Sequence, residues 1–280
     1  MLLDARKIPE IGRLFEFENS DACKKLKGSN ITLSMALFLA LAHRSAIDSK
    51  NIALALAIES LDLPGVQAGI DRLSNRGSQI SSEPFGAPIF DLYRITSKND
   101  LLSPEWSLFY DRFRRSAANG KRSDMFRAVG GVLGEMGDNV VWHAFENEHK
   151  SCPALAAFHV EDGVASFCVA DTGQGYLNSL KRNPCWQGLR RDEEALDAIV
   201  NKNATSRMGE KAGGGFKDLF NSLLDFNGCV FLRSGGAFFH LENAHKSKKL
   251  TSRISHHVVG SSVTVIVSPR SQPVEIPLKI

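Results

Sequence analysis

The chain has 280 residues, a formal net charge of +3 and an apolar fraction of 43%. This is the composition of a globular protein, with enough apolar side chains for one large domain or two ordinary ones. The small positive excess suits an anionic ligand, but it falls short of the charge that a dedicated nucleic-acid-binding domain carries.

The cysteines and the apolar segments indicate a cytoplasmic protein. The five cysteines are scattered and odd in number, and they form neither a C-x-x-C pair nor a zinc-binding pattern. The N-terminus lacks the basic start and the long apolar core of a signal peptide. The most apolar stretch, Ile31 to Ala42, is about half of the ~20 residues that a membrane-spanning helix needs. We therefore expect a reduced, cytoplasmic environment and no membrane partner.

In chain order, the first hundred residues are expected to form a small α/β unit (1–100). Apolar spacing predicts a helix over 33–43 and a second helix over 66–77. Between them, 51–60 is expected to be a buried strand, although its alanines and leucines also suit a helix. The segment 78–88, rich in Ser, Gly and Pro, is predicted to be a loop.

Two helices are expected next. Leu101 to Arg115 is predicted to be a connecting helix with Pro104 in its first turn. Ser123 can cap the following helix. The apolar residues of that helix recur at helical spacing and form a stripe that we expect to be buried: Val129, Leu133, Met136, Val140 and Ala144.

A second set of residues on this helix is polar. Glu135, Asn139 and His143 recur every four residues, so a carboxylate, an amide and an imidazole lie along one side of the helix. Two interpretations are open: the side is a solvated outer face, or it holds a metal ion and a water molecule against an anion.

The chain then alternates strands and loops. Ala154–Val160 and Val164–Ala170 are expected to form a hairpin around Glu161-Asp162-Gly163. The second strand runs directly into Asp171-Thr172-Gly173-Gln174-Gly175. The polar stretch 176–212, with a short helix expected at 193–200, is longer than ordinary loops and predicts a functional lid.

The last part begins with three glycines, Gly213, Gly214 and Gly215, which open a helix expected over 216–226 and closed by Asn227-Gly228. A hairpin over 229–233 and 237–241 and a final strand over 262–267 follow. This order predicts an α/β chain of the two-layer α+β sandwich type, with a mixed or antiparallel sheet.

Three motifs resemble the three boxes of the GHKL superfamily, which contains gyrase, a heat-shock chaperone ATPase, histidine kinases and the mismatch-repair protein MutL. They are E-x-x-x-N-x-x-x-H at Glu135, Asn139 and His143, D-x-G-x-G at Asp171, Gly173 and Gly175, and the glycine loop at Gly213, Gly214 and Gly215. The resemblance implies a Bergerat-type domain over 106–270 that binds ATP and Mg²⁺, followed by a tail (271–280).

The resemblance also implies a role for each residue of the first two boxes. Asn139 would be the Mg²⁺ ligand, because its amide oxygen suits a hard ion. Glu135 would orient or deprotonate the attacking water. Asp171 would accept a hydrogen bond from the amino group of adenine, and Gly173 and Gly175 would allow the backbone to turn beside the base. His143 would approach a phosphate, or would pack at the helix end.

The third box departs from the usual G-x-G-x-G pattern. Gly213, Gly214 and Gly215 precede a helix N-terminus, which attracts phosphate oxygens. Lys217 stands where the last glycine is expected, and two interpretations are open: it is a further phosphate contact, or the loop closes differently. In the lid, Thr205, Ser206, Arg207 and Lys211 are either phosphate contacts or solvated loop residues. Gly260-Ser261-Ser262 resembles a Gly-Thr segment of the family that has a structural role.

The fold leaves the activity open. A histidine kinase is not expected, because His43 is the only histidine on an early helix and no acidic residue follows it. Gyrase-like and chaperone-like proteins carry a further domain, whereas a short tail follows here. We expect a standalone ATP-binding protein whose N-terminal unit resembles STAS-like regulatory folds.

Three functions remain open. The first is Mg²⁺-dependent ATP hydrolysis, or phosphoryl transfer to a serine of an unidentified partner protein, with Glu135 as the base. The second is an ATP-gated interaction protein without turnover. The third, a nucleic-acid-associated ATPase that uses the basic stretch from Arg112 to Arg122, is not favoured. The sequence leaves open whether the chain forms a homodimer.

Overall fold

The structure is a computed structural model. It describes residues 40, 70, 89–117, 123–144, 154–161, 164–206, 216, 217, 219, 220, 227–242, 247–251 and 258–268. The chain divides into two compact units, Met1–Gln79 with Glu275–Ile280, and Ile80–Val274. The elements expected before residue 88 lie outside the described residues, apart from Ala40 and Ile70, which are helical and buried.

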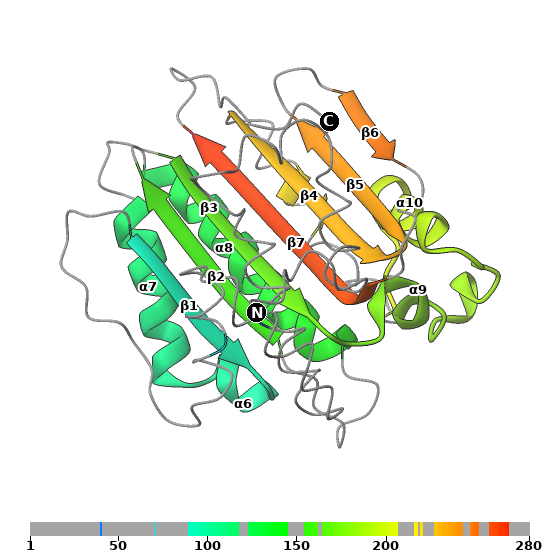
Figure 1. Ribbon diagram of the computed structural model, residues 1–280, viewed down its shortest axis with the longest axis horizontal. Helices are drawn as coiled ribbons and strands as arrows, with labels where there is room; N and C mark the ends of the chain where they lie inside the picture. Colours follow the sequence, from blue (N-terminus) through cyan, green and yellow to red (C-terminus); the bar gives the residue numbers. More distant parts are fainter. Residues whose placement is uncertain are drawn as a thin grey trace, which may run out of the picture. The chain divides into compact units, whose positions relative to one another are not determined.

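The described strands form one seven-stranded sheet in which every neighbouring pair is antiparallel. Their order across the sheet is β1-β2-β3-β7-β4-β5-β6 (Figure 1). The strands are β1 (Ile89–Ile95), β2 (Ala154–Glu161), β3 (Val164–Asp171), β4 (Asn227–Gly235), β5 (Ala237–Glu242), β6 (Ser247–Thr251) and β7 (Val258–Ser268). The protein is therefore of the α+β class, with the antiparallel form of the expected sheet.

Both edge strands were missed by the sequence analysis. β1 pairs with β2 and belongs to the second unit, although it falls within the range 1–100 that was expected to form the N-terminal unit. β6 pairs with β5 and contains Lys248 and Lys249. Charged residues of this kind are common on edge strands because they discourage pairing with another chain. Short edge strands have weak apolar alternation, so periodicity alone does not detect them.

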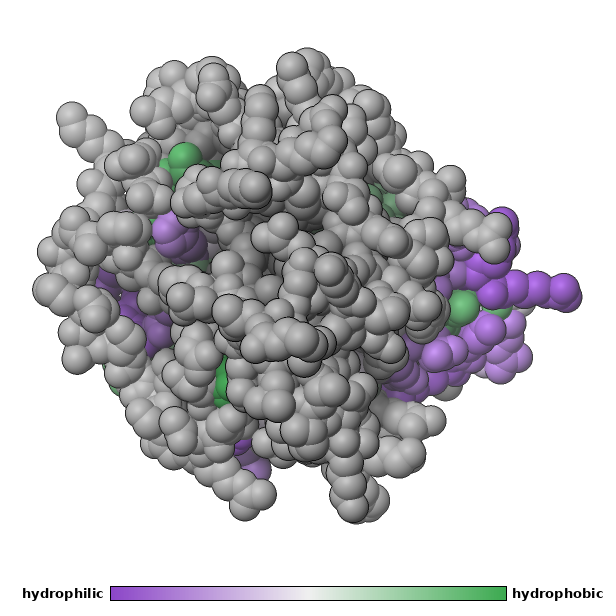
Figure 2. Space-filling model, viewed as in Figure 1, coloured by the Kyte–Doolittle hydropathy of each residue, from purple (hydrophilic) through white to green (hydrophobic). Residues whose placement is uncertain are grey.

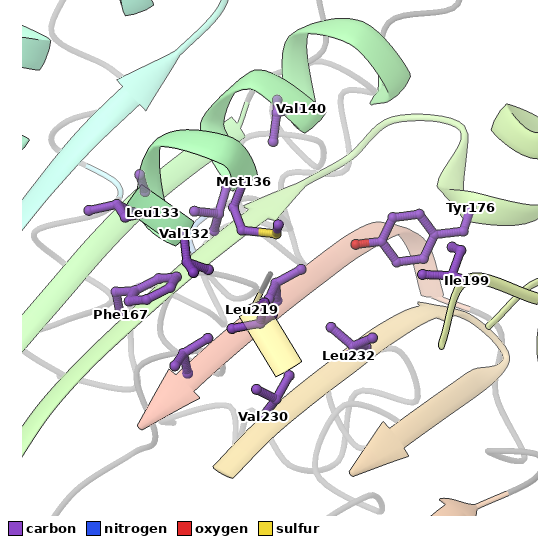
Figure 3. Packing of buried hydrophobic residues seen from close by; sticks show 14 of the residues in the cluster. Val132, Leu133, Met136, Val140, Phe167, Tyr176, Ile199, Leu219, Val230 and Leu232 are labelled. Carbon is purple, nitrogen blue, oxygen red and sulfur yellow. The ribbon is translucent and has the colours of Figure 1, made fainter. Parts of the chain in front are cut away.

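The helices cover one face of the sheet and bury alternate strand residues (Figures 1 and 3). α7 (Pro104–Ala117) and α8 (Ser123–Asn139) pack on β1 to β3, after the short α6 (Lys98–Leu101). α9 (Gly175–Leu180) and α10 (Asp192–Lys202) pack on β7, β4 and β5. Each buried Phe or Val side chain between these layers contributes about 1.5–3 kcal/mol. The predicted stripe of α8 is confirmed: Val129, Leu133, Met136, Val140 and Ala144 are all buried.

For the described part of the expected lid, 176–206, the short helix expected at 193–200 is confirmed by α10 (Asp192–Lys202), but the stretch before it is not wholly irregular. This segment forms α9, the 3₁₀ turn η3 (Pro184–Trp186) and α10, and it places Tyr176, Leu180 and Leu196 in the core. Its hydrophilic residues face solvent, on the right of Figure 2. The segment is thus amphipathic, and its polar composition reflects the outer faces of helices. Residues 207–215 lie outside the described residues.

The helix expected over 216–226 is described at four positions, all helical. β4 already begins at Asn227, so Asn227-Gly228 belongs to a strand and does not close that helix. No helix in the described part of the chain is long and apolar enough to cross a bilayer.

Candidate functional site

A pocket lies between the end of α8, the end of β3, the start of α9 and β7. Its polar lining residues come from all four elements: Asn139, His143, Asp171, Tyr176 and Ser261. Its apolar lining is mainly Met136, Val140, Ala144, Val169 and Val263. The first two sequence motifs therefore meet in one pocket, since Asn139 and His143 come from the first, and Asp171 and Gly175 from the second.

The end of α8 widens into a π-turn, η2 (Val140–Ala144). In an α-helix each four-residue step rotates a side chain by about 40°, so a stripe at this spacing turns gradually away from one direction. The i→i+5 bonds of a π-turn give a smaller rotation per residue and oppose this drift. As a result Asn139 and His143 both line the pocket, whereas Glu135, one turn earlier, is exposed to solvent.

The loop of the second motif is fastened to this helix end. The Gln174 side chain donates a hydrogen bond to the His143 carbonyl at 2.5 Å, and its backbone N–H donates to the Ala144 carbonyl at 3.4 Å. Carbonyl groups at a helix C-terminus have no partner within the helix, so Gln174 satisfies two of them. This residue, variable in D-x-G-x-G, holds the first two motifs together.

Three glycines permit the close contacts around this loop. A Cβ on Gly173 would lie 2.4 Å from the Ala144 carbonyl oxygen. Gly175 has a φ of +73°, and Gly260 has a φ of +92° and faces Asp171, whose carbonyl oxygen would lie 1.9 Å from a Cβ on Gly260. Any other residue at these positions would collide with the backbone or require a strained conformation.

Asp171, at the end of β3, is almost fully buried and accepts several hydrogen bonds. Its Oδ1 accepts from the Gly173 N–H at 2.7 Å, and its Oδ2 accepts from the Ser261 hydroxyl at 2.5 Å. A backbone hydrogen bond from Ser261 also reaches the carboxyl group. Burial nevertheless dominates these bonds and raises the pKa of the carboxyl group from 3.8 to about 6.

The register of the sheet explains this arrangement. Asp171 on β3 pairs with Ser261 on β7, which pairs with Ser234 on β4. Three polar residues therefore form a row on the helix-covered face, across strands whose other residues on that face are mostly apolar. The Ser234 hydroxyl accepts a hydrogen bond from the Tyr176 N–H at 2.8 Å, which anchors the first turn of α9 to the same row.

A second polar contact joins the helix end to Ser206, which follows α10. The His143 Nδ1 and the Ser206 hydroxyl are 2.7 Å apart. Ser206 is the last described residue before the segment that contains the glycine loop. His143 thus links the pocket to the chain entering that loop.

The remaining residues predicted for the site lie outside this pocket or outside the described residues. Glu135 is exposed and does not line the pocket, and Lys217 is exposed and does not line it either. Gly173 supports the loop by its contact with Ala144. The loop glycines and two of the lid residues lie outside the described residues: Gly213, Gly214, Gly215, Arg207 and Lys211.

The described part of the chain provides few metal ligands. Within it, no three His, Cys, Asp or Glu side chains converge so that they could hold a metal ion. The Asn139 amide donates from Nδ2 to the Met136 sulfur, a weak contact at 3.8 Å. The Asn139 oxygen, which would be the metal ligand, is not used by that contact.

Seven residues that line the pocket were not predicted as site residues, and three of them matter most for its chemistry. Tyr176 directly follows the second motif, Ser261 was expected to be structural, and Met136 was expected only in the core. Of these three residues, only Tyr176 could have been suspected from the local sequence, because it directly follows Gly175 of the second motif. The contribution of Ser261 depends on strand pairing, which the sequence did not reveal.

No protein-family model and no curated protein matches this chain. The motifs and the pocket that they form are therefore the evidence for the class of protein.

The contact between Gly173 and Ala144 can be tested by substitution. We expect Gly173→Ala to lower the free energy of unfolding by about 1–3 kcal/mol, because the added Cβ forces the loop away from η2. The matched control is Gly188→Ala, where a Cβ would have nothing within 4 Å. Urea denaturation measures both variants. Equal stability of the two would contradict the close packing of the loop.

The raised pKa of Asp171 predicts a pH dependence of stability. Between about pH 4 and pH 6 the folded protein retains a proton on Asp171 that the unfolded chain has released. Stability from this group is therefore greatest below the unfolded pKa and falls by about 3 kcal/mol as the pH rises to about 6. We expect the stability of the wild type minus that of Asp171→Asn to decrease across this window in urea denaturation. A constant difference would show that the carboxyl group titrates normally.

Proposed function

We propose that this chain binds ATP with Mg²⁺ in the pocket between α8, β3, α9 and β7, as a Bergerat-type domain of the GHKL kind. One observation carries the proposal: Asn139 and Asp171, which belong to separate motifs, line the same pocket. The antiparallel sheet with helices on one face is compatible with such a domain.

The inner end of the pocket suits an adenine base. The Asp171 carboxylate can accept a hydrogen bond from the amino group of adenine, and guanine presents a carbonyl oxygen at the same position. A site built around an acceptor rejects a ligand that places another acceptor there. Val169, Met136 and Val263 provide apolar contacts for a flat ring.

The outer end suits the phosphates and their metal ion. The Asn139 amide oxygen can serve as one protein ligand, because Mg²⁺ bound to a nucleotide takes its other ligands from phosphate oxygens and water. His143 and Ser206 lie where the chain leads toward the glycine loop. The role of Gly213, Gly214, Gly215 and Lys217 as phosphate contacts stays a prediction.

The selection of the base provides the first test. We expect the wild type to bind ATP in the presence of Mg²⁺ more tightly than GTP, and Asp171→Asn to bind ATP about 10- to 100-fold more weakly, because it loses a hydrogen bond to a charged acceptor. Asp197→Asn on α10, whose carboxyl group contacts Asn201 and Lys202, is the matched control. Calorimetry measures the affinities. Equal affinity of the wild type for ATP and GTP would contradict the role given to Asp171.

A second candidate is an ATP-gated interaction protein that does not hydrolyse the nucleotide. The exposed position of Glu135 outside the pocket lining favours it, because a general base must come within about 3 Å of the attacking water. Hydrolysis or transfer to a protein serine requires Glu135 to approach the outer end of the pocket when the nucleotide is bound.

Glu135→Gln separates the two candidates. For an enzyme we expect phosphate release to fall by at least about 100-fold while ATP binding is retained, since the variant keeps the shape of the side chain and loses its basicity. Asp138→Asn, on the same helix and also exposed, is the control that should retain activity. Phosphate release by the wild type that persists unchanged in Glu135→Gln would remove Glu135 as the base, and ATP binding without any release would favour the switch.

A further inference from the structure

The pocket is nearly filled by the protein itself. It leaves about 20 Å³ of space for the centres of water-sized molecules, which is room for about one water. A purine has two fused rings and cannot enter without the displacement of a side chain. One of the lining side chains must therefore move out of the pocket when a base binds.

Tyr176 is the lining side chain that projects from α9, whereas the other lining side chains come from α8, η2, β3 and β7. Its ring reaches from α9 toward the space between Met136 on α8 and the strand β7, with the hydroxyl group leading (Figure 3). The Tyr176 and Ser261 side chains line the same pocket, and the Tyr176 hydroxyl interacts with that of Ser261. Burial first, and then the neighbouring Asp171 carboxylate, raise the pKa of the phenol. It therefore stays protonated and acts as a donor.

The Tyr176 hydroxyl occupies the position that the amino group of a bound base would take. The Ser261 hydroxyl donates to Asp171 Oδ2 at 2.5 Å, so its lone pairs remain for the Tyr176 hydroxyl. The amino group of adenine is also a donor and would approach the same Asp171–Ser261 pair. A protein donor and a ligand donor thus compete for one pair of acceptors.

We propose that Tyr176 is a gate of the base pocket, whose hydroxyl stands in for the amino group of the base and must leave before the base can bind. This inference rests on the proposed function. Binding then exchanges one hydrogen bond for another, and the closed conformation lowers the apparent affinity by the fraction of molecules that are open.

The gate also connects the base pocket to the glycine loop. The Tyr176 ring contacts Phe216 edge to face, with centroids 5.8 Å apart. Phe216 is helical and directly follows Gly213, Gly214 and Gly215 in the sequence. Two further ring contacts extend this series to the sheet: the centroids of Phe216 and Phe220 are 6.2 Å apart, and those of Phe220 and Phe239 on β5 are 5.9 Å apart. Movement of Tyr176 therefore changes the packing of the helix expected to hold the phosphates.

The test compares full-length variants by calorimetry with three probes: ATP with Mg²⁺, adenosine and inorganic tripolyphosphate. Tyr176→Phe keeps the ring and its contact with Phe216 and removes only the competing hydroxyl. We expect it to bind ATP and adenosine about five-fold more tightly than the wild type, since one neutral hydrogen bond holds the gate closed. Its affinity for tripolyphosphate should not change, because this probe has no base.

Two further variants provide a second test of the gate and a control. Phe216→Leu weakens the ring contact that holds Tyr176, so adenosine affinity should rise by about three-fold. Tyr93→Phe is the matched control, because it also removes a buried hydroxyl with two hydrogen bonds, to Asp100 and Ser103, but at a position that does not line the pocket. It should bind all three probes as the wild type does.

The outcomes separate the gate from the proposed function. If the wild type binds ATP and neither Tyr176→Phe nor Phe216→Leu binds adenosine more tightly, the gate is wrong and ATP binding stands. An equal gain for tripolyphosphate also overturns the gate, because the hydroxyl would not act at the base. If no variant and no wild type binds ATP or adenosine, the proposed function fails and the gate fails with it.

Discussion

The position of β7 between β3 and β4 is the constraint on which the rest of the site depends. This antiparallel pairing aligns Asp171, Ser261 and Ser234 in one row, although they are distant in the chain. Gly260 allows the strand to approach the Asp171 backbone more closely than any side chain permits. The row supplies the hydrogen-bond donors that hold a buried carboxyl group and the acceptor that anchors Tyr176. Without this register the carboxyl group would be buried with fewer partners, which is costly in an apolar interior.

The helix end and the loop of the second motif act as one unit. Gln174 satisfies the carbonyl groups of His143 and Ala144, and Gly173 lets the two backbones touch. The π-turn keeps His143 directed at the pocket that Asn139 also lines. Small displacements of the loop would therefore move both Asp171 and the polar residues Asn139 and His143 across the pocket. This coupling provides a physical reason for two motifs to function together.

The Tyr176 gate extends this coupling to the third motif. Its hydroxyl interacts with Ser261 in the pocket, and its ring contacts Phe216, which follows the glycine loop in the sequence. A closed and an open position of one side chain would give the domain two states that a nucleotide can shift, because the nucleotide binds only one of them. Such a device suits an enzyme that must admit its substrate and equally a switch that must report it.

The local features of this chain were determined by the sequence itself. Helical spacing identified the buried stripe from Val129 to Ala144, and the strand pattern identified the hairpin of β2 and β3, since both depend on neighbouring residues. The tertiary structure alone decided the central place of β7, the helix α9 at the start of the expected lid, the exposure of Glu135 and the entry of Tyr176 into the pocket. These features depend on pairing and packing between residues far apart in the chain, and periodicity within a short window carries no information about such partners.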